Sequence, residues 1–172
     1  NAQLGIAVLL TAAAIAAKCR AELFDMDSLA RATARAGNPA IPMVEQLTAL
    51  VGKDDDEAMR FVHWGATSQD AIDTGFTLQL RSALERIEAE FEILSGSLAE
   101  LSKKHRATPV AGRTLMQQAL PTTFGFKAAG WLDAVNRHRE RLRDAGRRAL
   151  VVQFGGAVGT LAALGSSGLD VA

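Results

Sequence analysis

The chain has 172 residues, of which 48% are hydrophobic, so it is long enough to bury a core within one domain or slightly more. Its 19 basic and 19 acidic residues balance, which argues against nucleic-acid binding and against a basic membrane-binding surface. The single cysteine, Cys19, excludes an internal disulfide and fits a reducing compartment, so we expect a cytoplasmic protein.

The first segment, residues 2–17, is apolar and rich in alanine. It falls short of the roughly 20 residues that a membrane span needs, and no basic region precedes it. We therefore predict a buried helix that ends near Lys18–Arg20, with no membrane association. Because the chain starts at Asn1 without methionine and stops soon after Gly168, we expect it to be a piece of a longer protein.

Short helices follow. Asp27 or Ser28 is predicted to cap a helix over residues 29–36 that Gly37 terminates, and a further helix is predicted over residues 41–51. The acidic run at residues 54–57 resembles a cation site, but carboxylates in a first turn also favour the helix dipole, and we predict no metal there.

Two long helices are expected next. The first spans residues 74–105, roughly 45 Å at 1.5 Å per residue. Its apolar residues alternate steps of four and three, which predicts packing in a bundle. These residues are Leu80, Leu84, Ile87, Phe91, Leu94, Leu98 and Leu101. A loop at residues 107–112 precedes the second long helix, which is predicted to start near Pro121 and end near Leu150.

These elements predict an all-α fold. Residues 1–73 would form part of a small N-terminal helical domain, and residues 74–172 the start of a central long-helix bundle. Between the second long helix and a last helix capped by Thr160, the glycines Gly155, Gly156 and Gly159 permit a tight turn.

The stretch from Phe61 to Gly75 carries the polar groups. Thr67 and Asp70 have the spacing of a helix capping box, so a simple helix start explains them. The same helix N-terminus suits an anion, and Thr67, Ser68 and His63 would add hydrogen-bond donors. The spacing alone leaves both interpretations open.

Three ordered motifs resemble the fumarase/aspartase/adenylosuccinate lyase superfamily. They are His63-Trp-Gly-Ala-Thr-Ser-Gln-Asp70 with Asp73-Thr74, the segment Gly112–Gly125, and Gly155-Gly-Ala-Val-Gly-Thr-Leu-Ala162. Residues 19–25, residues 37–42 and Trp64 most resemble one branch of it, the bacterial 3-carboxy-cis,cis-muconate cycloisomerases, or lactonizing enzymes.

The resemblance implies an enzyme that adds to the double bond of an anionic substrate without a metal or other cofactor. It assigns His63 and Ser68 to catalysis, and Thr67, Arg113, Thr114 and Gln117 to substrate binding. An ion pair is the structural alternative for Arg113, and a loop-closing hydrogen bond is the alternative for Gln117. The superfamily's mobile loop with its catalytic serine has no counterpart in these residues.

Leu115 occupies the position where fumarases and adenylosuccinate lyases typically carry a histidine, and it can neither transfer a proton nor donate a hydrogen bond. Lactonizing members share this departure from histidine. The resemblance thus favours lactonisation of 3-carboxy-cis,cis-muconate in protocatechuate catabolism. It also implies a homotetramer whose sites are shared between subunits.

Other functions stay open at this point. One is a cycloisomerase for another anionic muconate, such as a sulfomuconate. Another is an adenylosuccinate- or argininosuccinate-type lyase that uses a different acid. A third, from a different class, is a catalytically silent helical-bundle assembly protein in which Leu115 marks a dead site.

Overall fold

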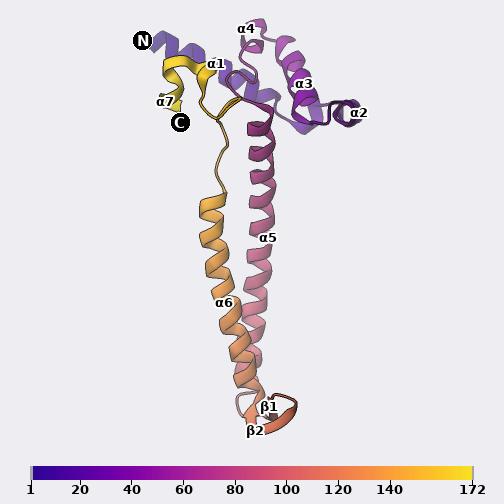
Figure 1. Ribbon diagram of the computed structural model, residues 1–172, viewed down its shortest axis with the longest axis vertical. Coiled ribbons are helices and arrows are strands. Elements are labelled where there is room, and N and C mark those ends of the chain that lie inside the picture. The colour runs from indigo at the N-terminus through magenta and orange to yellow at the C-terminus, as the bar shows by residue number, and fades with distance from the viewer. Residues whose placement is uncertain (1, 172) are drawn as a thin grey trace. The chain divides into compact units, whose positions relative to one another are not determined.

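The computed structural model describes residues 2–171 and confirms the all-α fold class, with one short hairpin as an exception (Figure 1). The elements are α1 (Ala2–Lys18), the 3₁₀ helix η1 (Ala21–Leu23), α2 (Met26–Ala36), α3 (Ala40–Gly52), α4 (Asp56–Met59), α5 (Ser68–Lys104), β1 (Pro109–Thr114), β2 (Gln117–Thr123), α6 (Phe124–Ala149), the 3₁₀ helix η2 (Ala162–Ser167) and α7 (Gly168–Val171). They form two compact units, one of residues 2–76 with 152–171 and one of residues 77–151.

Side-chain caps define the short helices of the first unit. Helix α2 begins three residues earlier than expected, because Asp25 rather than Asp27 or Ser28 caps it, and its carboxylate accepts the Ser28 N–H at 2.9 Å. Gly37 ends this helix as predicted, with a left-handed φ of 66°. Asp55 caps α4 by accepting two backbone N–H groups, which explains the acidic run without a cation.

Helix α1 is less buried than the sequence suggests. It contacts α3 and α4, yet Leu9 and Leu10 remain 70% and 65% exposed. The expectation of a buried helix is therefore wrong over residues 9–18 of this chain, since only one side of the helix meets a neighbour. No helix in residues 2–171 combines the length and apolarity needed to cross a membrane.

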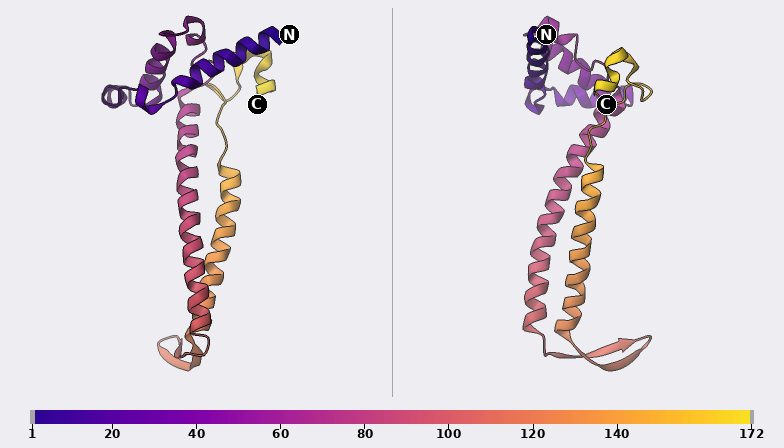
Figure 2. Two further views of the ribbon diagram at one scale, coloured as in Figure 1. Left: turned by 180° about the vertical axis from the view of Figure 1, so that it is seen from behind. Right: turned by 90° about the vertical axis from the view of Figure 1, so that its left-hand side faces the viewer.

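The second unit is a long helical pair. Helix α5 starts at Ser68, six residues before the predicted start, and α6 returns alongside it in the opposite direction (Figure 2). Hydrogen bonds join the two helices. Ser95 Oγ donates to Asn136 Oδ1 at 3.2 Å, and Ser102 Oγ donates to the Gly125 carbonyl at 3.0 Å.

The predicted apolar seam of α5 is only partly covered by α6. Ile87 and Leu94 in its middle are 44% and 42% exposed, whereas Ser95 is buried. The face of α5 that meets α6 therefore combines half-buried seam residues such as Leu84 with the buried Ser95. The remaining apolar surface is available for other helices of a bundle.

A hairpin replaces the predicted loop at residues 107–112. Strands β1 and β2 pair antiparallel, and Pro121 lies in β2 opposite Ala111. The expectation that Pro121 starts the second long helix is wrong. Thr123 caps that helix instead, with its Oγ1 accepting the Phe126 N–H at 3.1 Å. A two-stranded hairpin has only edge strands, which tolerate a residue without an N–H.

The glycine-rich segment after α6 is irregular. Residues 151–156 form no strand, and η2 follows Leu161, which has a left-handed φ of 52° and no side-chain cap. The expectation that Thr160 caps the last helix is therefore wrong.

Two glycines of α6 provide a matched test of the helical pair. A Cβ at Gly125 would lie 2.5 Å from the Ser102 carbonyl oxygen, whereas a Cβ at Gly130 would meet open space. We expect Gly125→Ala to lower the free energy of unfolding by about 1–3 kcal/mol through this clash with backbone. Gly130→Ala should instead raise it by up to about 1 kcal/mol, because alanine favours a helix. Denaturant unfolding of the full-length protein measures both, and equal effects would contradict this packing.

Candidate active site at the start of helix α5

The polar turn before α5 is held in an uncommon backbone conformation. His63 has a φ of 62°, which non-glycine residues rarely adopt, and Gly65 has a φ of 77°. The Ala66 N–H donates to the His63 carbonyl at 3.2 Å, and α5 begins at Ser68. Strained backbone of this kind concentrates at functional sites.

Helix α5 offers unpaired donors at this end. Within the described residues, the N–H groups of Ser68, Gln69 and Asp70 have no hydrogen-bond partner. His63, Thr67 and Ser68 are all half-buried. Free N–H groups, hydroxyls and an imidazole at a helix N-terminus form a suitable environment for a carboxylate.

Asp70 connects this turn to the glycine-rich segment. Its Oδ2 accepts the Thr67 N–H at 2.9 Å, which is half of the predicted capping box. The same oxygen accepts the Gly156 N–H at 2.9 Å, and Oδ1 accepts the Gly155 N–H at 3.0 Å. One carboxylate therefore satisfies three backbone donors from two distant segments.

These bonds govern the ionisation of Asp70. Desolvation acts to raise its pKa, but the N–H groups of Thr67, Gly156 and Gly155, together with the charge of His63, outweigh desolvation and hold the pKa below its usual 3.8. Asp70 is thus a carboxylate at neutral pH.

Two glycines let the backbones approach closely. A Cβ on Gly65 would lie 2.7 Å from Leu164 Cδ2, and a Cβ on Gly156, whose φ is 73°, would lie 2.9 Å from the Gly65 carbonyl oxygen. Thr74 adds a second link to the segment, because its Oγ1 accepts the Gln153 N–H at 3.1 Å. The turn at residues 63–66 is therefore packed directly on the glycine-rich segment.

The other predicted site residues lie in the second unit, on the hairpin. Thr114 and Gln117 are brought together as partners across β1 and β2, and Arg113 is opposite Gln118. Arg113, Thr114 and Gln117 are exposed, and in the described part of the chain Arg113 forms no ion pair. Leu115 lies at the tip and is 89% exposed.

A groove of about 440 Å³ borders the hairpin. Its lining includes Arg113 from β1 and Lys127 from α6. Two cations beside an open groove suit an anion. Sequence reasoning did not single out Lys127, and its place in a helix with many basic residues gave no distinguishing signal.

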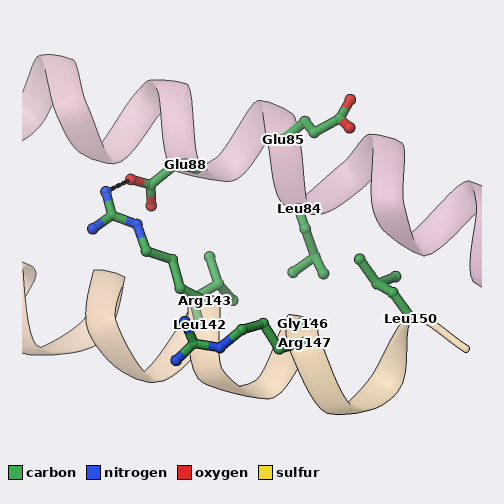
Figure 3. A pocket seen from close by; sticks show the side chains of 8 residues that line it. All are labelled: Leu84, Glu85, Glu88, Leu142, Arg143, Gly146, Arg147 and Leu150. Carbon is green, nitrogen blue, oxygen red and sulfur yellow. Dashed lines mark hydrogen bonds and ion pairs between the residues drawn. The ribbon is translucent and has the colours of Figure 1, made fainter.

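A second groove, of about 600 Å³, lies between α5 and α6 (Figure 3). It is lined by Leu84, Glu85, Glu88, Leu142, Arg143, Gly146, Arg147 and Leu150. None of the predicted site residues lies there. Glu88 instead pairs with Arg139 at 2.8 Å and with Arg143, and its Oε2 is buried without a hydrogen-bond partner.

No set of three or more histidine, cysteine, aspartate or glutamate side chains within residues 2–171 is arranged to hold a metal ion. The acidic residues near α4 have other roles: Asp54 pairs with Lys18, and Asp55 caps the helix.

Residues 2–169 match the protein family described as Lyase, and the chain belongs to that family. The 3-carboxy-cis,cis-muconate cycloisomerase of Pseudomonas aeruginosa is 53% identical over 100% of this chain, which spans 38% of that relative. A nitrosuccinate lyase of Streptomyces davaonensis is 47% identical over 94% of this chain and 34% of that protein.

The solved structure of the 3-carboxy-cis,cis-muconate lactonizing enzyme from Pseudomonas putida superposes with a TM-score of 0.87 at 52% identity, covering 94% of this chain and 37% of that one. The predicted resemblance and the predicted fumarase-type helical bundle are confirmed. The chain covers somewhat more than a third of the length of these relatives.

The Glu88 cluster yields a pH-dependent test. The Arg139 and Arg143 guanidinium groups lower the pKa of Glu88 below its usual 4.5, against the effect of desolvation. A carboxylate with a lowered pKa stabilises the fold fully above its unfolded-state pKa, and this stabilisation is lost as the pH falls through the folded-state pKa. We expect Glu88→Gln to lower the thermal unfolding midpoint at pH 7. The difference from wild type should shrink as the pH falls below 4.5 and disappear only below the lowered pKa of Glu88 in the folded state.

Glu90 is exposed and forms no ion pair in the described chain, so Glu90→Gln is the control. A midpoint loss of Glu88→Gln that persists unchanged at acid pH would contradict the ion-pair explanation.

Proposed function

We propose that the complete protein is a cycloisomerase that lactonises 3-carboxy-cis,cis-muconate in cytoplasmic aromatic catabolism. The observation that carries this proposal is the 53% identity, over the whole chain, to a relative of that name. Leu115 supports it, since the corresponding histidine of fumarase-type lyases is replaced by a side chain that cannot transfer protons.

The reaction is an internal addition. An oxygen of one substrate carboxylate forms a bond to an alkene carbon, the π bond breaks, and a proton is added to the neighbouring carbon. Negative charge builds on a second carboxylate conjugated with that alkene, so fixed donors around it lower the barrier. Holding the attacking carboxylate against the alkene supplies much of the remaining acceleration. This chemistry involves no net oxidation, and we propose that no cofactor takes part.

His63, Thr67, Ser68 and the free N–H groups at the start of α5 are proposed to bind the substrate carboxylate. The helix N-terminus supplies partial positive charge where negative charge accumulates. His63 and Ser68 are assigned to catalysis because they combine donors with half-burial next to this charge. The proton donor is assigned to a part of the protein beyond these residues.

Arg113, Thr114 and Gln117 are proposed to complete the pocket in a homotetramer whose sites combine different subunits. The hairpin supports this assignment. Leu115 and Met116 at its tip and Leu120 in β2 are between 85% and 98% exposed, and apolar surface of this kind marks contact with another protein segment.

An ultraviolet assay of the full-length protein with 3-carboxy-cis,cis-muconate tests the reaction. Loss of the diene absorbance with a lactone as product is the expected result. Turnover of a sulfonated muconate alone would change the substituent but keep the reaction class. Absence of turnover on both would overturn the proposal and favour a silent assembly protein, unless an elimination is found.

Elimination is the second candidate function, because a relative named nitrosuccinate lyase is 47% identical. Lactonisation releases no second product, whereas elimination from a succinate derivative releases fumarate. Fumarate analysis with nitrosuccinate and with adenylosuccinate as substrates therefore separates the two reaction classes.

His63→Ala and Ser68→Ala test the assigned groups. We expect each to reduce kcat/KM at least about 100-fold, the loss typical of a removed anion-stabilising donor. Assembly and helical content should be retained.

His138→Ala and Ser97→Ala are matched controls, because both side chains are exposed on the long helices. If the His63 and Ser68 variants keep wild-type kinetics, the anion-pocket assignment is wrong and the polar turn is only a helix start.

A further inference from the structure

The Asp70 carboxylate bridges two parts of the first unit that are far apart in sequence. Its bonds to Gly155 and Gly156 cross 85 and 86 residues, whereas its bond to Thr67 stays within one turn of α5. A capping box needs only the last of these. The two long-range bonds therefore call for a different explanation.

The two long-range bonds place Gly156 against the turn that carries His63 and Thr67. Gly156 lies so close to the turn that a Cβ on it would be 2.9 Å from the Gly65 carbonyl oxygen. Gly65 follows His63 by two residues and precedes Thr67 by two. Any shift of Gly156 away from Asp70 would thus release the turn that carries both groups.

The turn has few other restraints. Its backbone bonds are local, from Trp64 to Phe61 at 3.2 Å and from Ala66 to His63 at 3.2 Å. Local bonds alone do not stabilise the positive φ of His63, which requires surrounding contacts to hold it. Those contacts come from the glycine-rich segment and from Leu164, which a Cβ on Gly65 would approach to 2.7 Å.

We propose that Asp70 is a positioning residue: it holds the segment at Gly155–Gly156 against the turn at residues 63–66 and so fixes His63 and Thr67 for the substrate anion. The expected effect of Asp70 on KM rests on the proposed function. Its effect on the position of the turn does not. Asp70 is not assigned a substrate contact, because its carboxylate accepts three backbone N–H groups and its negative charge disfavours an approach by the anionic substrate.

Asp70→Asn tests the role in the full-length protein. The amide keeps one acceptor oxygen but places an NH₂ group against one of the backbone N–H groups. Hydrogen exchange at Gly155 and Gly156 should accelerate at least about tenfold, the loss expected for a hydrogen bond to a charged group. Exchange at Trp64 and Ala66 should accelerate as well, because the turn loses its support.

Kinetics on the assembled fraction provide the second measurement. We expect KM for the muconate to rise at least about fivefold, because misplaced donors bind the anion less tightly. A loss of stability alone would reduce the amount of active enzyme and leave KM unchanged.

Asp55→Asn is the matched control. Asp55 also accepts two backbone N–H groups, from Glu57 and Ala58, but it caps α4 and makes no bond to the glycine-rich segment. This variant should leave KM and the exchange of Trp64 and Ala66 unchanged, whatever its effect on the unfolding midpoint.

Three results would overturn the positioning role. Unchanged exchange at Gly155 and Gly156 would show that the carboxylate does not hold them. Accelerated exchange confined to those glycines, with Trp64 and Ala66 still protected, would show that Asp70 binds the glycine-rich segment without holding the turn. An unchanged KM despite a released turn would remove its connection to substrate binding.

A wrong functional assignment would give a different set of results from a wrong assignment of Asp70. If wild-type protein turns over no muconate, the cycloisomerase assignment falls. The exchange measurements on the four amides still decide whether Asp70 positions the turn.

Discussion

A single carboxylate organises the part of the first unit that carries His63, Thr67 and Ser68. Asp70 accepts one N–H from its own turn and two from a segment 85 and 86 residues further along the chain. Buried N–H groups left without acceptors are costly, so these bonds favour one arrangement of an otherwise irregular glycine-rich segment. Because the donors also lower the pKa of Asp70, the carboxylate stays ionised and the arrangement holds at neutral pH.

The second unit leaves much of its apolar surface uncovered. Helices α5 and α6 meet through serine, asparagine and a Glu88–Arg139 pair as well as through part of the leucine seam, where Leu84 lies close to Gly146. Ile87 and Leu94 of that seam are exposed, and the Leu115–Met116 tip of the hairpin is among the most exposed apolar surface of the described chain. Apolar surface on this scale is typical of an interface. It agrees with a chain that spans 38% of a relative belonging to the same family.

These two units divide the proposed chemistry. The first supplies a helix N-terminus with unpaired donors, and the second supplies Arg113, Thr114 and Gln117 on a hairpin, beside a groove that also includes Lys127. An addition to an alkene needs charge stabilisation at a carboxylate and a proton at carbon. The proposal assigns the first task to these residues. It assigns the second to another part of the protein, because Leu115 cannot transfer a proton.

The sequence by itself determined the helical class and the presence of two long helices, because periodicity acts over a few residues. It placed the start of α5 six residues too late and left the direction of the helical pair open. The resemblance of ordered motifs indicated the lyase family, which the match over residues 2–169 then established. Tertiary structure decided the rest. Pro121 pairs in a hairpin instead of opening a helix, one side of α1 remains exposed over residues 9–18, and Asp70 reaches Gly155 and Gly156. Each of these outcomes depends on which distant segment lies opposite, and no local pattern of residues encodes that partner.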